Sequence, residues 1–266
     1  MKSFITIPVI QGNKLQLNFS SVGFLQVFDI NELFFHIVAN HSFLDFEVIG
    51  NTSIVGYLER INFFFNLEKL IGITRRKESP YTGDQARLHE LKIFRYKPDF
   101  ESTSKKMYSM FIDIGLSGET SSILVSTLSE ISDNAFGHNL GRWPFKTGPM
   151  IICLIQQYHA SRESAVSLLD FGVGFFETLK DNYPDIKTEH EAVHLAIQSN
   201  VTGRIGKKGG NGLTYLQKNI FNGFAGELEI RSGNCLVRIE KSGSSRVIED
   251  NLPFTFGAHV GFKIHY

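Results

Sequence analysis

Two polar side chains lie one helical turn apart in a segment that is otherwise apolar. Glu130 and Asn134 are four residues apart, so an α-helix places them on the same face. A carboxylate and an amide on such a face are costly unless they have polar partners. An amide oxygen is a hard ligand that suits Mg²⁺, and a nearby carboxylate can orient water or accept a proton from it. The pair is therefore a candidate for magnesium-assisted phosphate chemistry. The alternative is a solvent-facing pair on an amphipathic helix.

An acidic residue at the end of an apolar run is the second candidate. Asp170 follows the strand-like segment 165–169 and precedes Gly172 and Gly174. Glycines at these positions allow a tight turn and a close approach of the backbone to a ligand. A buried aspartate at a strand end can accept a hydrogen bond from an exocyclic amine. An ordinary loop remains the alternative, because Asp-x-Gly-x-Gly is a common pattern.

A basic, glycine-rich segment is the third candidate. Residues 202–212 include Lys207, Gly210 and Gly212, and they run directly into a helical pattern that begins at Leu213. Glycines let backbone N–H groups converge on an anion, and the helix N-terminus adds a partial positive charge. The spacing differs from the P-loop, which requires Gly-Lys-Ser/Thr before its helix. A solvated flexible loop remains the alternative.

Taken together, the three patches resemble the N, G1 and G2 boxes of the GHKL ATPase superfamily, which includes gyrase, the Hsp90 chaperones, histidine kinases and MutL. They follow in the superfamily order, about forty residues apart. The resemblance implies ATP and Mg²⁺ as ligands. It implies that Glu130 activates water, that Asn134 ligates Mg²⁺ and that Asp170 recognises the adenine amino group. Gly210 and Gly212 match the Gly-x-Gly-Leu signature of the superfamily. The other residues that the resemblance assigns to nucleotide binding are Gly172, Gly174, Lys207 and Leu213.

One feature near the C-terminus departs from the superfamily pattern. Members often carry a Gly-Thr pair that leads into the last strand, and the threonine hydroxyl helps to hold the nucleotide. Gly257 and Ala258 occupy that place here, and alanine has no hydroxyl. We expect either weaker nucleotide binding or compensation by another group.

Residues 1–75 are expected to form a small α/β domain, because strand-like and helix-like patterns alternate. The predicted elements are a strand at 14–19, a helix at 29–40, a strand at 46–49 and a helix at 52–64. The segment 15–38 resembles the STAS domain of bacterial anti-sigma-factor antagonists. Active antagonists carry a phosphorylatable serine at the start of the helix, whereas residues 25–29 have no hydroxyl. The resemblance therefore implies that this phospho-switch is missing, and structural packing is the alternative role.

Residues 107–266 are expected to form one ATP-binding domain. The resemblance implies a Bergerat-type α/β sandwich, with helices on one face of a mixed sheet. Residues 76–106 are rich in charge and are expected to connect the two domains. The predicted elements are helices at 116–139, 190–199 and 212–221, paired strands at 150–157 and 164–169, a hairpin of 227–231 and 236–240, and a closing strand at 260–265.

Composition argues against several other classes of function. The 266 residues carry a formal net charge of zero, which gives no electrostatic argument for nucleic acid or an anionic membrane. No apolar run approaches the roughly 20 residues that span a bilayer, so we expect a cytoplasmic protein. Cys153 and Cys235 lie in apolar, strand-like segments, which favours two buried thiols over a disulfide or a zinc site.

The resemblance leaves the output of ATP binding open. The first hypothesis is a bacterial regulatory ATPase or nucleotide switch, whose state is read by the N-terminal domain or by a protein partner; a homodimer is one arrangement of this kind. The second is a serine/threonine protein kinase of the anti-sigma-factor type. The third is a non-catalytic interaction module with a degenerate nucleotide site.

Overall fold

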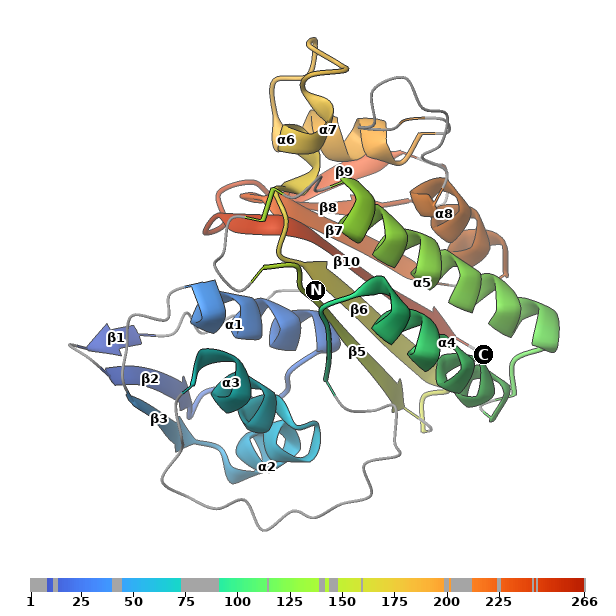
Figure 1. Ribbon diagram of the computed structural model, residues 1–266. Coiled ribbons are helices and arrows are strands. Elements are labelled where there is room, and N and C mark those ends of the chain that lie inside the picture. The colour runs from blue at the N-terminus through green and yellow to red at the C-terminus, as the bar shows by residue number, and fades with distance from the viewer. Residues whose placement is uncertain are drawn as a thin grey trace.

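The computed structural model describes most of the chain. The described residues are 9–11, 14–39, 45–72, 91–113, 115–138, 142–143, 148–158, 160–198, 201, 212–223, 226–240, 242 and 244–265. They form an α/β structure with a three-stranded sheet and a seven-stranded sheet (Figure 1).

The three-stranded sheet and three helices make an N-terminal unit. Its elements are β1 (Val9–Gln11), β2 (Lys14–Phe19), α1 (Val27–Ala39), β3 (Asp45–Gly50), α2 (Thr52–Arg60) and α3 (Phe63–Ile71). Helix α1 connects β2 to β3, and these two strands pair in parallel. The parallel pairing follows from the helix, because a crossover of this length returns the chain in the same direction. The expected β-α-β order is confirmed.

The single helix expected over 52–64 is wrong, because the chain turns between α2 and α3. Asn62 adopts a left-handed conformation, with φ 59° and ψ 26°, which asparagine tolerates better than most residues. Leu91 holds this turn from outside: its N–H donates to the carbonyl of Ile61 at 2.9 Å, and its carbonyl accepts from Asn66 Nδ2 at 2.8 Å. A distant segment therefore fixes a break that the local helical pattern does not reveal.

The seven-stranded sheet is antiparallel at every described pairing. Its strands are β4 (Lys92–Phe94), β5 (Ile151–Tyr158), β6 (Glu163–Asp170), β7 (Glu227–Gly233), β8 (Cys235–Ile239), β9 (Ser245–Glu249) and β10 (Thr255–His265). They lie in the order β4-β5-β6-β10-β7-β8-β9. The mixed sheet expected from the superfamily resemblance is therefore wrong. Short connections join β5 to β6, β7 to β8 and β8 to β9, and connections of this length produce antiparallel neighbours.

Three helices cover one face of this sheet, and two more lie at its end (Figure 1). The covering helices are α4 (Lys97–Asp113), α5 (Gly118–His138) and α8 (Gly212–Gly223), and the other two are α6 (Gly174–Leu179) and α7 (Glu189–Ala196). Part of the segment 76–106, which was expected to be a connector, therefore belongs to the layers as β4 and the start of α4. Residues 76–90 lie outside the described residues.

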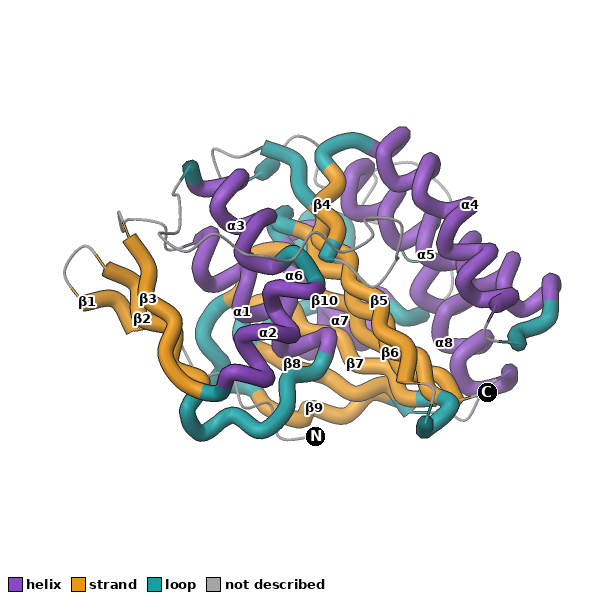
Figure 2. Tube along the Cα trace, turned by 90° about the horizontal axis from the view of Figure 1, so that it is seen from below, coloured by secondary structure: helices purple, strands orange, loops and turns teal. Residues whose placement is uncertain are grey.

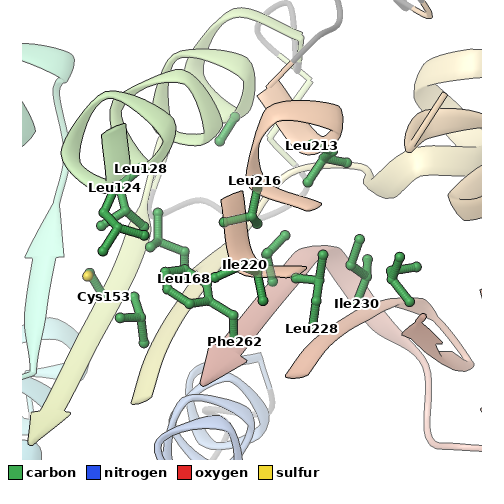
Figure 3. Close-up of a cluster of buried hydrophobic side chains, with 14 of the residues drawn as sticks. Leu124, Leu128, Cys153, Leu168, Leu213, Leu216, Ile220, Leu228, Ile230 and Phe262 are labelled. Carbon is green, nitrogen blue, oxygen red and sulfur yellow. The ribbon is translucent and has the colours of Figure 1, made fainter. Parts of the chain in front are cut away.

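The helices of the C-terminal part that cover the large sheet lie on one face, as expected, and the opposite face packs on the N-terminal unit (Figure 1). Side chains of β5 alternate between the two sides: Ile151, Cys153 and Ile155 join the core under α5 and α8, whereas Ile152 and Leu154 join the core that contains α1. Figure 2 shows the sheet between these helical layers, and Figure 3 shows the core under α5 and α8. Both cysteines are free and buried, as expected.

Helix α1 is enclosed between the small sheet and the large one. Every residue from Ile30 to Val38 is buried, including Asn31, Glu32 and His36. A helix that is buried all round is normally apolar all round. The polar residues of α1 must therefore find partners inside the protein.

Candidate functional site

The first predicted pair lies on the outer layer, on α5. Glu130 is exposed and lines a groove of about 410 Å³ between α5 and α8. The other residues that line this groove are Ser122, Ile123, Ser126, Thr127, Tyr215 and Asn219. Asn219 Nδ2 donates to Thr127 Oγ1 at 3.3 Å, which joins the two helices at the groove. Asn134 is half-buried one turn after Glu130.

The neighbouring acidic residue of α5 faces a different helix. Asp133 forms an ion pair with Lys97 of α4, with Lys97 Nζ 2.7 Å from Asp133 Oδ2. Glu130 instead lines the groove beside α8. The two carboxylates therefore lie on different faces of α5. Asp133 contacts α4, whereas Glu130 is exposed to solvent. A solvated carboxylate among hydroxyl and amide groups can orient a water molecule.

Asp170 ends strand β6, and its carboxylate accepts two backbone hydrogen bonds. Oδ1 accepts from the N–H of Gly172 at 2.8 Å, and Oδ2 accepts from the N–H of Ala258 at 3.2 Å. A carboxylate offers about four acceptor positions, and these two backbone bonds fix how the Asp170 carboxylate is oriented at the strand end. Strands β6 and β10 therefore bring Asp170 beside Gly257 and Ala258, the pair at which the chain departs from the superfamily pattern.

Two glycines around Asp170 are required by close backbone contacts. Gly257 has φ +79°, and a Cβ there would lie 1.9 Å from the Asp170 carbonyl oxygen. Gly174 has φ +84°, and a Cβ there would lie 2.9 Å from Ser232 Oγ. The hydroxyl of Ser232 also accepts from the N–H of Phe175 at 3.0 Å, which fixes the start of α6. The tight turn expected after Asp170 is confirmed.

The third patch is described only at its C-terminal end. Gly212 begins α8, and Leu213 is a core residue that packs under this helix (Figure 3). Thr214 Oγ1 donates to the carbonyl of Ile197 at 2.9 Å and so joins the first turn of α8 to the end of α7. Lys207 and Gly210 lie outside the described residues.

The elements that carry the three patches meet at one end of the large sheet. Arg142 Nη1 donates to the carbonyl of Glu177 at 3.4 Å, so the chain that follows α5 lies beside α6. Helix α6 begins four residues after Asp170 and packs beside α7 (Figure 1). The Thr214–Ile197 bond joins the start of α8 to the end of α7. Asp170 is nevertheless absent from the described lining of the groove that contains Glu130. The structure brings Asp170, Gly172 and Gly174 together with β10, and it places Glu130 separately, beside α8.

A buried polar cluster between α1 and the large sheet was not predicted. Glu32 Oε1 lies 2.6 Å from His259 Nδ1, and Glu32 Oε2 lies 2.6 Å from Arg231 Nη1. His259 Nε2 lies 2.6 Å from Ser167 Oγ, which also accepts from Asn31 Nδ2 at 2.7 Å. We call these five residues the Glu32 cluster. The available signal was the presence of Asn31, Glu32 and His36 inside an otherwise apolar helix, and the sequence pattern alone assigned them no role.

The charges of the Glu32 cluster balance inside the protein. Burial alone would raise the pKa of the Glu32 carboxyl, but the hydrogen bond with His259 and the positive charge of Arg231 hold it below its usual value. Burial lowers the pKa of His259, although Glu32 opposes this shift. We therefore assign a neutral imidazole that donates from Nδ1 to Glu32 and accepts at Nε2 from Ser167.

Ser167, His259 and Glu32 have the connectivity of an acid–base triad, yet they are not placed to act on an external substrate. All three are 0% exposed. The ring of Phe28 stacks on the His259 ring, with centroids 3.6 Å apart and planes 11° apart. A nucleophile must reach the bond that it attacks, so this enclosed chain of hydrogen bonds serves to hold α1 on the sheet.

One further motif on α7 was not considered in the sequence analysis. His190-Glu191-Ala192-Val193-His194 has the His-Glu-x-x-His spacing of zinc peptidases. Glu191 instead forms a capping box with Thr188 at the start of the helix, and His194 Nδ1 lies 2.8 Å from Ser245 Oγ. In the described part of the chain, no group of three or more His, Cys, Asp or Glu residues could hold a metal ion. The motif therefore contributes a helix cap.

No helix in the described ranges is both long enough and apolar enough to cross a membrane. The chain matches no model of a known protein family, and it matches no curated protein sequence.

Proposed function

We propose that this protein binds ATP and Mg²⁺ through its C-terminal unit and acts as a nucleotide-dependent regulator with slow hydrolysis. The proposal combines the resemblance to the GHKL superfamily with the geometry around Asp170. Asp170 would accept the adenine amino group, Asn134 would ligate Mg²⁺ and Glu130 would orient the attacking water.

The contact between Asp170 and Ala258 is the observation that carries this proposal. The resemblance identified Asp170 and the Gly257-Ala258 pair independently, 88 residues apart in the chain. Their hydrogen bond brings both beside the glycine turn that follows β6. Ala258 departs from the superfamily threonine, so the contact supports the position of this pair beside Asp170 and not a complete motif. The backbone amide of Ala258 also gives Asp170 a fixed donor where the superfamily has a threonine.

The residues on α5 fit a magnesium nucleotide by their chemistry. Mg²⁺ takes oxygen ligands and usually keeps several waters. Asn134 offers an amide oxygen, and Glu130 is exposed in a groove whose volume lies within the usual range for ligand sites. When bound, Mg²⁺ would neutralise charge on the phosphates, while Glu130 would hold the water.

Thermal unfolding with nucleotides tests the proposal directly. ATP with Mg²⁺ at 100 times its Kd should stabilise the protein by about 2.7 kcal/mol, because the ligand binds only the folded state. GTP with Mg²⁺, and ATP with excess chelator, should give smaller shifts. No shift with ATP would contradict ATP binding and would favour a non-catalytic interaction module.

Measurement of phosphate release then distinguishes ATP hydrolysis from phosphorylation of a protein. Glu130→Ala should lower ATP turnover by about 100-fold or more, since general-base catalysis contributes on that scale. The fold should be unaffected, because the Glu130 side chain is exposed. Glu119→Ala is the matched control, because Glu119 is another exposed glutamate on α5. Transfer of a γ-phosphate label to a second protein would instead favour the protein-kinase hypothesis.

A further inference from the structure

We propose that α1 positions the acceptor at Asp170, with Glu32 and His259 as positioning residues that act through the backbone of Ala258. Docking of α1 and nucleotide binding would then be energetically coupled. The nucleotide part of this inference rests on the proposed function, whereas the coupling between α1 and Asp170 does not.

Two adjacent residues of β10 make the contact with Asp170 and the contact with Glu32 of α1. The N–H of Ala258 donates to Asp170 Oδ2, and the imidazole of the next residue, His259, bonds to Glu32 of α1. Thr255 Oγ1 also lies 3.5 Å from Glu32 Oε2. Thr255 and His259 both contact Glu32, so both side chains face α1. Residues 255–259 are therefore held by α1 through their side chains and by Asp170 through the backbone.

Close contacts in residues 255–259 make it difficult to move the end near Glu32 without also moving the end near Asp170. Backbone atoms of Asp170 and Gly257 are so close that only glycine fits at position 257. A displacement of His259 toward or away from Glu32 must therefore change the position of the Ala258 N–H relative to Asp170. The pairing of β10 with β7 shifts register between Thr255 and Ala258, which makes this the irregular part of the strand. Strand irregularities of this kind are common next to functional sites, where they re-aim a side chain or end the pairing.

The chemistry of the docking surface makes the position of α1 specific. Arg231 and Glu32 are almost completely buried, and Asn31 bonds to both the hydroxyl and the carbonyl of Ser167. Such bonds are strong only at correct geometry, and a buried charge that loses its partner is costly. Helix α1 also connects β2 to β3, so its position is shared with the rest of the N-terminal unit.

Coupling predicts reciprocal effects, since two linked equilibria change each other by the same factor. Glu32→Gln should lower the affinity for ATP by about tenfold, within the usual range of allosteric coupling. It should also lower the preference for ATP over GTP, because the acceptor at Asp170 is no longer held in place. A merely structural loss of stability would leave that preference unchanged. Glu240→Gln is the control, because it removes one partner of an exposed ion pair with Arg246.

Hydrogen–deuterium exchange of the full chain supplies the second measurement. Binding of ATP with Mg²⁺ should slow exchange in residues 255–259 and in α1. Unchanged ATP affinity and ATP preference in Glu32→Gln, together with unchanged exchange in α1, would overturn the inference while leaving ATP binding intact.

Hydrogen–deuterium exchange can also test the coupling between α1 and Asp170 if the protein does not bind ATP. Asp170→Ala removes both acceptors of Asp170 and should speed exchange in 255–259 and in α1 without any nucleotide. Faster exchange only in peptides next to Asp170, with α1 unchanged, would overturn the coupling. The absence of ATP binding in the unmodified protein would contradict the proposed function separately.

Discussion

Asp170 and Glu32 are both carboxylates near β10, yet their surroundings give them different roles. Asp170 is half-buried and accepts two backbone N–H groups. Glu32 is enclosed, and it is bonded to an imidazole and a guanidinium group. Backbone groups of the glycine turn and β10 therefore orient Asp170, whereas side chains of the large sheet bind Glu32 and hold α1. The sequence identified only the first, because an acidic residue before a glycine turn is a local pattern.

Asp170→Asn should weaken binding of adenine nucleotides. The amide has a single oxygen, so the two N–H donors and the adenine amino group must compete for fewer acceptor positions. Loss of one hydrogen bond to a charged group should reduce ATP affinity by about 10- to 150-fold, which calorimetry measures. Circular dichroism should show that the fold is retained. Unchanged ATP affinity would refute the assignment of Asp170.

At the scale of single elements, local patterns predicted most helices and hairpins. The largely apolar runs of β5 and β6, and the turn between β7 and β8, produce hairpins near the expected positions. The insertion of β10 between β6 and β7 was not predictable, because this pairing depends on contacts between distant segments. Enclosure of α1 was missed for the same reason: the neighbours that accept its polar side chains lie more than 130 residues away.

In the candidate site too, local turns were predictable from the sequence, whereas roles that depend on packing were not. The glycine turn after β6 follows from its sequence, and the structure confirms it through the contacts of Gly174. Leu213 was assigned to nucleotide binding by the resemblance, but its side chain contributes to the core. A leucine at the start of a helix has the same sequence pattern in either role, so only packing distinguishes them.

Asn62 provides a test of the turn between α2 and α3. Asn62→Ala should destabilise the protein by about 1 kcal/mol, because a left-handed conformation costs non-glycine residues roughly 1–2 kcal/mol and asparagine less. Asn62→Gly should be nearly neutral or slightly stabilising, since glycine adopts this conformation without steric cost. Urea denaturation of the two variants measures the difference. Equal stability of the alanine and glycine variants would show that the backbone at Asn62 is not left-handed.

Across the whole molecule, the large sheet is a layer shared by two cores. One core lies under α5 and α8 and is largely apolar, whereas the other contains α1 and is crossed by the Glu32 cluster. Protonation of the buried residues Glu32 and His259 therefore acts on the side of the sheet that faces α1. The two units of this protein should consequently respond to pH through the surface that joins them.

Acidification should destabilise the protein through His259. Burial holds the pKa of His259 below its ordinary value of 6.5 in the folded state, so the unfolded chain binds the proton first as the pH falls. The resulting stability is present above pH 6.5 and is lost as the pH drops toward the pKa of the folded state. Between pH 7 and pH 5 this one group contributes a loss of at most about 2 kcal/mol.

Comparison with His259→Gln isolates that contribution. Glutamine cannot titrate in this range, so the free energy of unfolding of the variant should fall less steeply between pH 7 and pH 5. The variant should be less stable at pH 7, because Glu32 and Ser167 lose a well-placed partner; the slope, rather than the absolute stability, is the relevant measurement. His36, whose pKa is also lowered by burial, is present in both proteins and leaves a common residual slope. Parallel slopes in urea denaturation would show that His259 is not held neutral at the joint between α1 and the sheet.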